Sequence, residues 1–299
     1  MPDFPIVDSH VHLYDPALID YPWMQDMPAL NQAHYPDRFF AATGSIEVEA
    51  MVVVEVDAQT GRHLDEAQFI ARLAATEPRI RGFVAALPLH QSTPIDAELE
   101  RLASLPLVRG IRTLIEPHQA HPGWALQASL IANLRKLPTY DLSFDLCLRH
   151  PQLGDVISLV RQCPQVRFVL DHIAKPGIRE GLSEPWRSQL RELANEPNVW
   201  CKLSGVVTEA DHAHWTESQV RPYIDHAIDC FGFGRLMFGS DWPVAELATT
   251  YERWVEMVDR LIVGASAHEC RQLYRDNVIH CYRLGSVPGA GPELARTIN

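Results

Sequence analysis

The chain has 299 residues, 46% of them apolar and 21% charged, which is the composition of an ordinary globular protein and excludes a disordered, collagen-like or coiled-coil chain. Its 26 basic and 38 acidic residues give a formal net charge of −12 without any basic block, which argues against nucleic acid or an anionic membrane surface as a partner. No segment approaches the ~20 consecutive apolar residues that a membrane-spanning helix needs.

The N-terminal residues and the cysteines both indicate a cytoplasmic protein. The opening sequence MPDFPIVDSH has neither the basic region nor the apolar region of a secretory signal peptide. The cysteines are scattered and form no Cys-x-x-Cys pair, which fits reduced thiols better than disulfides or a zinc cluster. They are Cys147, Cys163, Cys201, Cys230, Cys270 and Cys281.

Short apolar runs recur along the chain, at residues 5–13, 50–58, 81–89, 108–116, 142–148, 166–172, 198–205 and 235–241. Most are continuously apolar rather than alternating, which is typical of strands buried on both faces, as in a parallel sheet. Helical periodicity fills the remaining segments, at 63–76, 95–104, 124–136, 153–162, 185–194, 218–230, 247–262 and 267–284.

The alternation of strands and helices predicts an α/β fold, a (β/α)8 TIM barrel. We expect a single domain over residues 1–284, followed by a Gly/Pro-rich C-terminal tail at 285–299. A doubly wound open sheet is the alternative. That fold does not need eight strands, and no Gly-rich phosphate loop follows any of the runs.

Residues 14–35 interrupt the alternation with a long segment rich in Pro, Asp and aromatic residues. A long loop in a compact domain is usually functional. This one leaves the carboxyl end of the first strand, the face at which barrel active sites lie. Trp23 in this loop and Trp242 after the eighth strand are candidates for covering a substrate ring, although such aromatic residues more often pack against the protein.

Two histidines, His10 and His12, end the first strand. Residues i and i+2 of a strand point to the same side, so both imidazoles are expected to face the centre of the barrel mouth. Such a pair can bind one divalent metal ion or donate two hydrogen bonds to an oxyanion. The alternative is a polar strand end without a ligand.

His172 follows the sixth strand and Asp241 follows the eighth, so both are expected at the same mouth. A carboxylate close to imidazoles is the expected general base for activating water, which makes Asp241 the candidate base. The competing interpretations are a histidine that is satisfied at its strand end and an aspartate that caps a short helix.

Further charged residues near strand ends are candidates for substrate binding: Glu55, Arg112, Asp145 and Lys202. Arg112 can bind a substrate carboxylate, carbonyl or hydroxyl, or can form an ion pair with Asp145 or Glu55. Glu55 and Asp145 can accept hydrogen bonds from sugar hydroxyls. Lys202 can contact substrate or remain inside the barrel, paired with Asp8 or Asp171. Of the other histidines, only His118 and His121, just beyond the fourth strand, are candidates for the site.

Taken together, these motifs resemble the amidohydrolase superfamily (amidohydrolase 2 type), and within it the branch of sugar-lactone and 2-pyrone-4,6-dicarboxylate lactonases. The resemblance rests on the order and spacing of Asp8-x-His10-x-His12, Asp171-His172 with Lys175-Pro176, Lys202-Leu203-Ser204-Gly205 and Phe238-Gly239-Ser240-Asp241-Trp242. It extends over essentially the whole predicted barrel.

The resemblance implies a (β/α)8 fold and hydrolysis of a lactone ring. His10 and His12 match the histidine pair of the family's first strand, His172 matches its histidine on the sixth strand, and Asp241 matches its base on the eighth. Many members of the superfamily bind one or two divalent metal ions, whereas this branch includes members that work without a required metal.

A binuclear site in the superfamily usually uses a carboxylated lysine on the fourth strand and a histidine on the fifth. This sequence carries Arg112 and Asp145 in those strands. The resemblance therefore implies at most one metal ion, zinc or manganese, held by His10, His12 and Asp241.

The sequence thus predicts a hydrolase of carboxylic ester bonds that opens a sugar-acid lactone, as part of carbohydrate metabolism. Asp241 acts as the base, and the three histidines polarise the carbonyl with or without one metal ion. The absence of clustered arginines argues against a dicarboxylated pyrone as substrate. The alternatives are a metal-dependent aromatic-acid decarboxylase of the same superfamily and a non-catalytic barrel that binds a ligand. The predicted partner is a small lactone, and the sequence predicts no oligomeric state.

Overall fold

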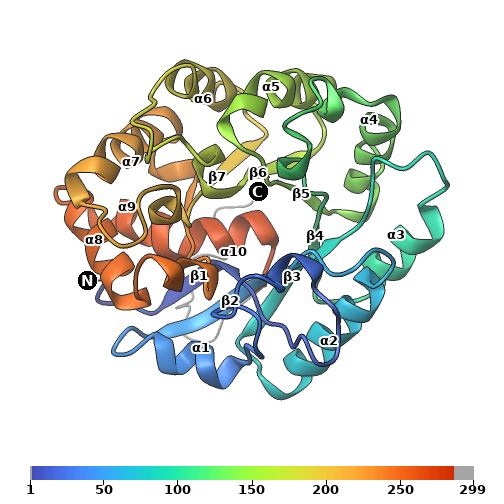
Figure 1. Cartoon of the computed structure of the whole chain (residues 1–299), viewed down its shortest axis with the longest axis horizontal. Coiled ribbons are helices and arrows are strands. Elements are labelled where there is room, and N and C mark those ends of the chain that lie inside the picture. Colours follow the sequence, from blue (N-terminus) through green and yellow to red (C-terminus); the bar gives the residue numbers. More distant parts are fainter. Residues whose placement is uncertain (1, 286–299) are drawn as a thin grey trace, which may run out of the picture.

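A computed structural model describes residues 2–285 of the chain and contains eight parallel strands in the order β1 to β8. The strands are β1 (Ile6–Val11), β2 (Val48–Val54), β3 (Ile80–Ala86), β4 (Val108–Arg112), β5 (Ser143–Leu146), β6 (Arg167–Leu170), β7 (Val199–Leu203) and β8 (Leu236–Phe238). Nearly all of their side chains are buried, as expected for strands covered on both faces. Figure 1 shows the strands at the centre and the helices around them.

The helices follow the strands in turn. They are α1 (Pro36–Ala42), α2 (His63–Thr76), α3 (Asp96–Ala103), α4 (Ala128–Leu134), α5 (Leu153–Gln162), α6 (Trp186–Ala194), α7 (Glu217–Phe231), α8 (Tyr251–Leu261), α9 (Ala267–Arg271) and α10 (Asn277–Tyr282). The predicted (β/α)8 barrel is confirmed. Of the predicted tail at 285–299, all but Gly285 lies outside the described residues.

The barrel closes where β1 meets the end of β8. Val11 and Trp242 form a parallel bridge, the amide of His12 donates to the carbonyl of Trp242 at 2.8 Å, and the amide of Asp241 donates to the carbonyl of His10 at 2.8 Å. The closure therefore consists of the same residues that carry the predicted chemistry.

Two layers of core hold the barrel together. The larger lies between the strands and the surrounding helices. The smaller fills the interior with side chains such as Val7, Val52 and Val84, and it includes Cys281 and Tyr282 of α10. In Figure 1, α10 lies across the middle of the ring of strands. This helix therefore covers one end of the barrel and leaves the carboxyl ends of the strands for the site.

Three helical segments differ from the sequence prediction. Helix α1 was not predicted, and it begins at Pro36, whose fixed φ suits the first helical position. The segment 124–136 contains a 3-10 turn and then α4, because Gln127 between them is extended. The segment 267–284 is interrupted by a wide π turn at Gln272–Asp276, where buried Arg275 pairs with Glu49.

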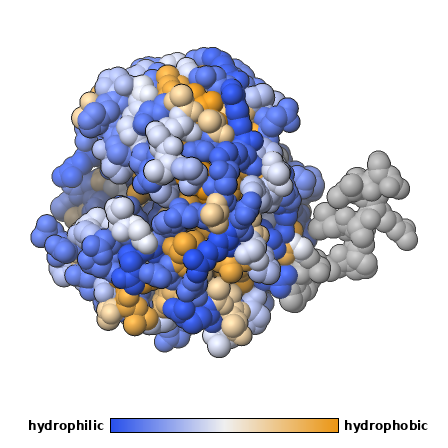
Figure 2. Space-filling model, turned by 90° about the vertical axis from the view of Figure 1, so that its right-hand side faces the viewer, coloured by the Kyte–Doolittle hydropathy of each residue, from blue (hydrophilic) through white to orange (hydrophobic). Residues whose placement is uncertain are grey.

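Few large apolar side chains are exposed on the described part of the chain. On the face seen in Figure 2, apolar residues are interspersed with hydrophilic ones. The large apolar side chains exposed in the described part of the chain are scattered: Leu18, Trp23, Leu182 and Val263. Within residues 2–285, no helix combines the length and apolar character needed to span a membrane.

Candidate active site

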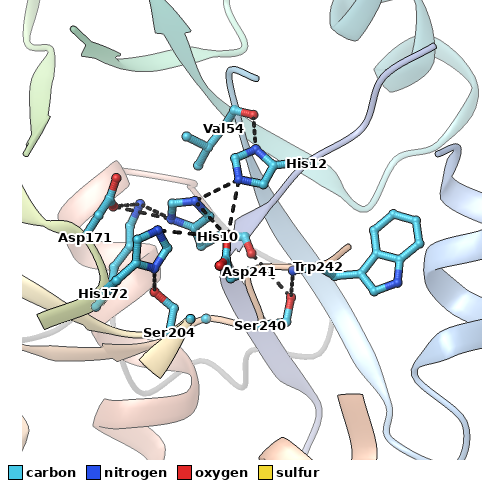
Figure 3. Close-up of polar contacts among 12 residues, drawn as sticks. His10, His12, Val54, Asp171, His172, Ser204, Ser240, Asp241 and Trp242 are labelled. Atoms are coloured by element: carbon cyan, nitrogen blue, oxygen red, sulfur yellow. Dashed lines mark hydrogen bonds and ion pairs between the residues drawn. The ribbon is translucent and has the colours of Figure 1, made fainter. Parts of the chain in front are cut away.

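Four predicted side chains meet at the carboxyl ends of the strands: His10, His12, His172 and Asp241 (Figure 3). Nε2 of His10 lies 3.2 Å from Nε2 of His12. Oδ1 of Asp241 lies 3.4 Å from Nε2 of His12, 3.7 Å from Nε2 of His10 and 3.9 Å from Nε2 of His172. All four are at most 5% exposed. We call these four residues the His–Asp cluster.

Asp8 joins the two strands that bring this cluster together. Its Oδ1 accepts hydrogen bonds from the amides of His10 and Ser240, both at 3.0 Å. Burial raises the pKa of Asp8 to about 6, against the opposing effect of these hydrogen bonds. The sequence motif includes Asp8, but its role as a link between β1 and β8 depends on the closed barrel and was not predicted.

The tautomer of His12 follows from its hydrogen bond. Its Nδ1 lies 2.9 Å from the carbonyl of Val54, and a carbonyl can only accept, so Nδ1 carries the proton. In the neutral ring, Nε2 therefore has a lone pair. This lone pair faces the carboxylate of Asp241 and the ring of His10, an arrangement suited to a proton donor or a cation between them.

A left-handed turn places His172. Residues His172, Ile173, Ala174 and Lys175 have φ angles of 52°, 47°, 64° and 44°. This conformation costs an L-residue ~1–2 kcal/mol, and such strain is found where a functional group has to be positioned. The Trp186 indole donates to the carbonyl of Ile173 at 2.8 Å, and Lys175 pairs with Glu116, so contacts on both sides hold the turn.

The same turn fixes both nitrogens of His172. Nδ1 lies 2.9 Å from the hydroxyl of Ser204, and Nε2 faces Asp241. Gly205 approaches both groups closely. A Cβ added there would lie 2.6 Å from Oδ2 of Asp241 and 2.7 Å from Nδ1 of His172, and its φ is +57°. The sequence predicted neither the turn nor the role of this glycine, because both depend on contacts between separate strands.

The charge states in the His–Asp cluster follow from burial and from its neighbours. Burial alone would raise the pKa of Asp241, but the neighbouring His172, His12 and His10 hold it below its usual range. Burial lowers the pKa of His172, and burial together with Lys202 lowers that of His10 well below its usual range. Near neutral pH the carboxylate is therefore ionised and these two rings are neutral.

A buried ionic network lies under the His–Asp cluster. Nζ of Lys202 lies 2.6 Å from Oδ2 of Asp145, 3.0 Å from Oδ1 of Asp171 and 3.2 Å from Nδ1 of His10. Arg112 pairs with Glu55 and, at 3.1 Å, with Asp171. Of the two carboxylate partners expected for each cation, the structure pairs Arg112 with Glu55 and Lys202 with Asp171.

Asp145 and Lys202 have no exposed surface. The remaining hydrogen bond to Oδ2 of Asp145 comes from the hydroxyl of Tyr282 at 2.6 Å. Both residues are enclosed between α10 and the His–Asp cluster. We therefore propose that they position the cluster and do not contact the substrate.

The indoles of the two tryptophans form their hydrogen bonds outside the His–Asp cluster. The indole of Trp23 is 38% exposed and donates to the carbonyl of Val56 at 2.8 Å. Trp242 is 2% exposed, packs against His34 and Phe39, and donates to Glu246. Figure 3 shows its ring pointing away from the histidines. We therefore do not propose that either indole contacts the substrate.

A cavity of about 420 Å³ opens beside the cluster, over the loops that follow β2, β3 and β4. Its lining includes Glu55 and Arg112. Both connect it to the cluster, because Val54, the residue before Glu55, accepts a hydrogen bond from Nδ1 of His12, and Arg112 contacts Asp171. Asp171 in turn lies 3.3 Å from His10.

The donor set fits one divalent metal ion. A tetrahedral zinc site with ordinary bond lengths has its ligand atoms about 3.3–3.6 Å apart. The three separations among His10, His12 and Asp241 are 3.2, 3.4 and 3.7 Å. The lone pair on Nε2 of His12 and the ionised carboxylate of Asp241 supply electron pairs for such an ion. A second possible group, His10, Asp171 and His172, shares His10 with the first.

Comparison with known proteins identifies the family. The amidohydrolase family model matches residues 7–284.

The chain belongs to the amidohydrolase family.

Two relatives named L-fucono-1,5-lactonase match almost end to end. The protein from Burkholderia ambifaria is 31% identical over 95% of this chain and 97% of its own length, and that from Burkholderia multivorans is 32% identical over 93% and 96%. A crystal structure of an amidohydrolase from Burkholderia multivorans with bound zinc has a TM-score of 0.83 at 32% identity, covering 94% of this chain and 100% of that one. The resemblance seen in the sequence is thus confirmed for the family.

Proposed function

We propose that this protein is a hydrolase that opens the ring of a sugar-acid lactone, with Asp241 as the general base. The observation that carries the proposal is the ionised carboxylate of Asp241, held 3.4–3.9 Å from three imidazole nitrogens at the mouth of the barrel. The relatives named as L-fucono-1,5-lactonases support the substrate class.

In the proposed reaction, a water molecule donates a proton to Asp241 as its oxygen adds to the lactone carbonyl carbon. The resulting tetrahedral oxyanion then expels the ring oxygen. The C–O bond breaks as Asp241 returns the proton to the departing alkoxide. The product is the open hydroxy acid, and Asp241 is ionised again.

The histidines take different parts in this reaction. When the hydroxyl of Ser204 donates to Nδ1 of His172, Nε2–H of His172 is free to donate to the lactone carbonyl oxygen. His12 carries its proton on Nδ1, so its Nε2 accepts from the attacking water beside Asp241. His10 completes the polar wall, held by Lys202 and Asp171. Preorganised donors of this kind contribute ~3–4 kcal/mol each in other enzymes.

One divalent metal ion, zinc or manganese, would be held by His10, His12 and Asp241. Such an ion acts as a Lewis acid on a carbonyl oxygen and lowers the pKa of bound water. The zinc in the related amidohydrolase crystal structure supports this site. Lactones are reactive esters, so the protein groups alone also suffice for the proposed reaction.

The charge around the cavity favours a neutral substrate. Glu55 and Asp57 line it, and its cation Arg112 is already paired with Glu55 and Asp171. A dicarboxylate would meet these carboxylates without an unpaired cation among the described lining residues. A neutral sugar lactone avoids this repulsion.

The proposal is tested by hydrolysis rates on a panel of aldono-1,4- and aldono-1,5-lactones, followed with a pH indicator. Asp241→Asn should lower kcat/KM by about 10²–10⁴-fold, because the neutral amide cannot accept the proton. Asp37→Asn, an exposed residue of α1, is the matched control. Parallel assays after chelation and after adding zinc or manganese show whether a metal contributes.

Two results would contradict the proposal. The first is a lactone rate that Asp241→Asn leaves unchanged. The second is no lactone hydrolysis under any metal condition together with release of CO2 from a dihydroxybenzoate, which would favour the decarboxylase alternative.

We also propose a cytoplasmic location with a small-molecule substrate as the partner. All six cysteines lie within the described residues and are free thiols there, as expected in a reducing compartment.

A further inference from the structure

The cavity beside the His–Asp cluster is lined in part by polar side chains that have no role in the proposed hydrolytic reaction. Its lining includes His90 in the loop after β3, His118 in the loop after β4, and Asp57 and Thr113. None of these four takes part in the proton transfers above. Each has a side chain that can exchange hydrogen bonds with an alcohol.

Both histidines are held rigidly. The ring of His118 stacks on Trp124 with its centroid 3.9 Å away and a 7° angle between the planes. The loop of His90 is fixed by hydrogen bonds to its backbone. The hydroxyl of Ser129 donates to the carbonyl of His90 at 2.6 Å, and the side-chain amide of Asn133 donates to the carbonyl of Leu89 at 2.9 Å. The ring of His118 and the loop that carries His90 are therefore preorganised.

His90 also lacks a partner for one nitrogen. Its Nδ1 is buried and has no hydrogen bond among the described residues. A buried polar atom without a partner is costly, and a ligand hydroxyl would remove that cost. An imidazole with one donor and one acceptor matches a hydroxyl, which also both donates and accepts.

The position of the cavity connects it to the reaction. Its inner wall is Glu55 and Arg112, and each is one contact away from a residue that touches the His–Asp cluster. We therefore infer that a lactone whose carbonyl accepts a hydrogen bond from His172 extends towards this cavity. The next histidine along, His121, is exposed and does not line the cavity.

We propose that this cavity is the subsite for the hydroxyl-bearing part of the lactone, and that His118 and His90 determine which hydroxylated lactones are accepted. The inference rests on the proposed lactonase function. It assigns these histidines to specificity and leaves the chemical step to the cluster.

The test compares two rings that differ only in their hydroxyl-bearing groups. kcat/KM is measured for the aldono-1,5-lactone that the wild type hydrolyses best and for δ-valerolactone, which has the same ring without hydroxyls. His118→Phe keeps the stacked ring on Trp124 and removes both nitrogens. It should lower kcat/KM for the aldonolactone about 10-fold or more and leave δ-valerolactone within about 2-fold. His121→Phe is the matched control and should change neither.

His90→Leu should act in the same direction as His118→Phe. Thermal unfolding of each variant shows that it is folded. The inference would be overturned if kcat/KM fell by the same factor for both lactones, or if the ratio of the two values stayed the same as in the wild type.

A binding measurement separates this inference from the proposed function. Calorimetry is carried out with an aldono-1,5-lactam, a neutral analogue of the lactone, and with δ-valerolactam. If the wild type opens no lactone but binds the hydroxylated lactam, and His118→Phe weakens that binding about 10-fold, the lactonase proposal fails and the subsite stands. If His118→Phe binds the hydroxylated lactam as tightly as the wild type does, the subsite is wrong whatever the hydrolysis rates.

Discussion

At the scale of single residues, one backbone carbonyl decides the role of an imidazole. Because Val54 can only accept, the proton of neutral His12 sits on Nδ1, and its Nε2 lone pair faces the carboxylate of Asp241. His172 has a hydroxyl partner instead, which permits the opposite tautomer. Two histidines of the same cluster are thereby suited to different tasks, accepting from water and donating to a carbonyl.

Gly205 has no room for a side chain next to Asp241 and His172. Gly205→Ala should lower kcat/KM at least 10-fold, because its Cβ would displace the carboxylate of Asp241 and the ring of His172. The control is Gly232→Ala, since Gly232 also has a positive φ (+61°) but has open space around it. The control should lose ~1 kcal/mol or more of stability and keep its activity. Equal activity in the two variants would refute the role of close approach at Gly205.

Glu66 gives a prediction about pH. Burial, reinforced by the neighbouring Glu55, raises the pKa of Glu66 to about 8 in the folded protein. The unfolded carboxyl ionises near pH ~4.3. The unfolded state therefore loses its proton first, and this group costs the protein stability as pH rises from ~4.3 towards 8.

Glu66→Gln should remove that contribution. Its amide oxygen can still accept from the Val56 amide and the Tyr21 hydroxyl. Urea unfolding of both proteins at pH 5 and pH 8 measures the effect. The wild type should lose more stability than the variant over this range, by on the order of 1 kcal/mol or more. Parallel losses in the two proteins would contradict the prediction.

At the scale of elements, the left-handed turn at His172–Lys175 is the segment that departs furthest from ordinary backbone. It is held by the Lys175–Glu116 ion pair, and Glu116 is also paired with Arg149 at 2.9 Å. The ion pair therefore acts on His172 through the backbone, which makes Lys175 a positioning residue.

Lys175→Met should lower kcat about 10-fold, since the turn loses a contact that offsets its strain. In a protein that already carries His172→Ala, the same change should have little further effect on kcat, because the two residues act through one group. Arg161→Met removes exposed ion pairs to Glu192 and Glu196 and serves as the control. Fully additive losses in the double variant would show that Lys175 acts independently of His172.

The same element shows what the sequence could and could not predict. Apolar runs located the strands, and the strand ends located His10, His12, His172 and Asp241, because parallel strands bring their carboxyl ends together. Four consecutive positive φ angles carry no local signal, since contacts from Trp186 and Glu116 impose them.

The sequence also did not predict how deeply each of these side chains is buried within the barrel. Asp145 in β5 and Lys202 in β7 have no exposed surface, whereas Arg112, the register partner of Asp145 at the end of β4, lines the cavity. The partner that completes the lower layer, Tyr282, comes from α10, 137 residues beyond Asp145. Sequence spacing alone gives no measure of such a contact.

At the scale of the whole molecule, α10 links the amino-terminal end of the barrel to the ionic network. The hydroxyl of Tyr282 donates to Asp145, and Nζ of Lys202 lies 5.4 Å from the centre of the Tyr282 ring. Tyr282→Phe should cost ~1–3 kcal/mol in the free energy of unfolding, because it removes a hydrogen bond to a buried carboxylate.

The matched control is Tyr274→Phe, which removes a buried hydroxyl that has no hydrogen-bond partner among the described residues. This change should be neutral or slightly stabilising. Chemical denaturation of both variants measures the difference. A Tyr274→Phe variant that loses as much stability as Tyr282→Phe would show that the hydrogen bond to Asp145 is not the cause.

The closure of the barrel between β1 and β8 has a consequence for biosynthesis. His10 is synthesised more than two hundred residues before Asp241, and Asp8 holds the two strand ends together. A nascent chain on the ribosome, or one truncated before β8, holds only part of the cluster. Catalytic competence would therefore arise in a single late event, so that prematurely terminated products are inactive rather than partly active.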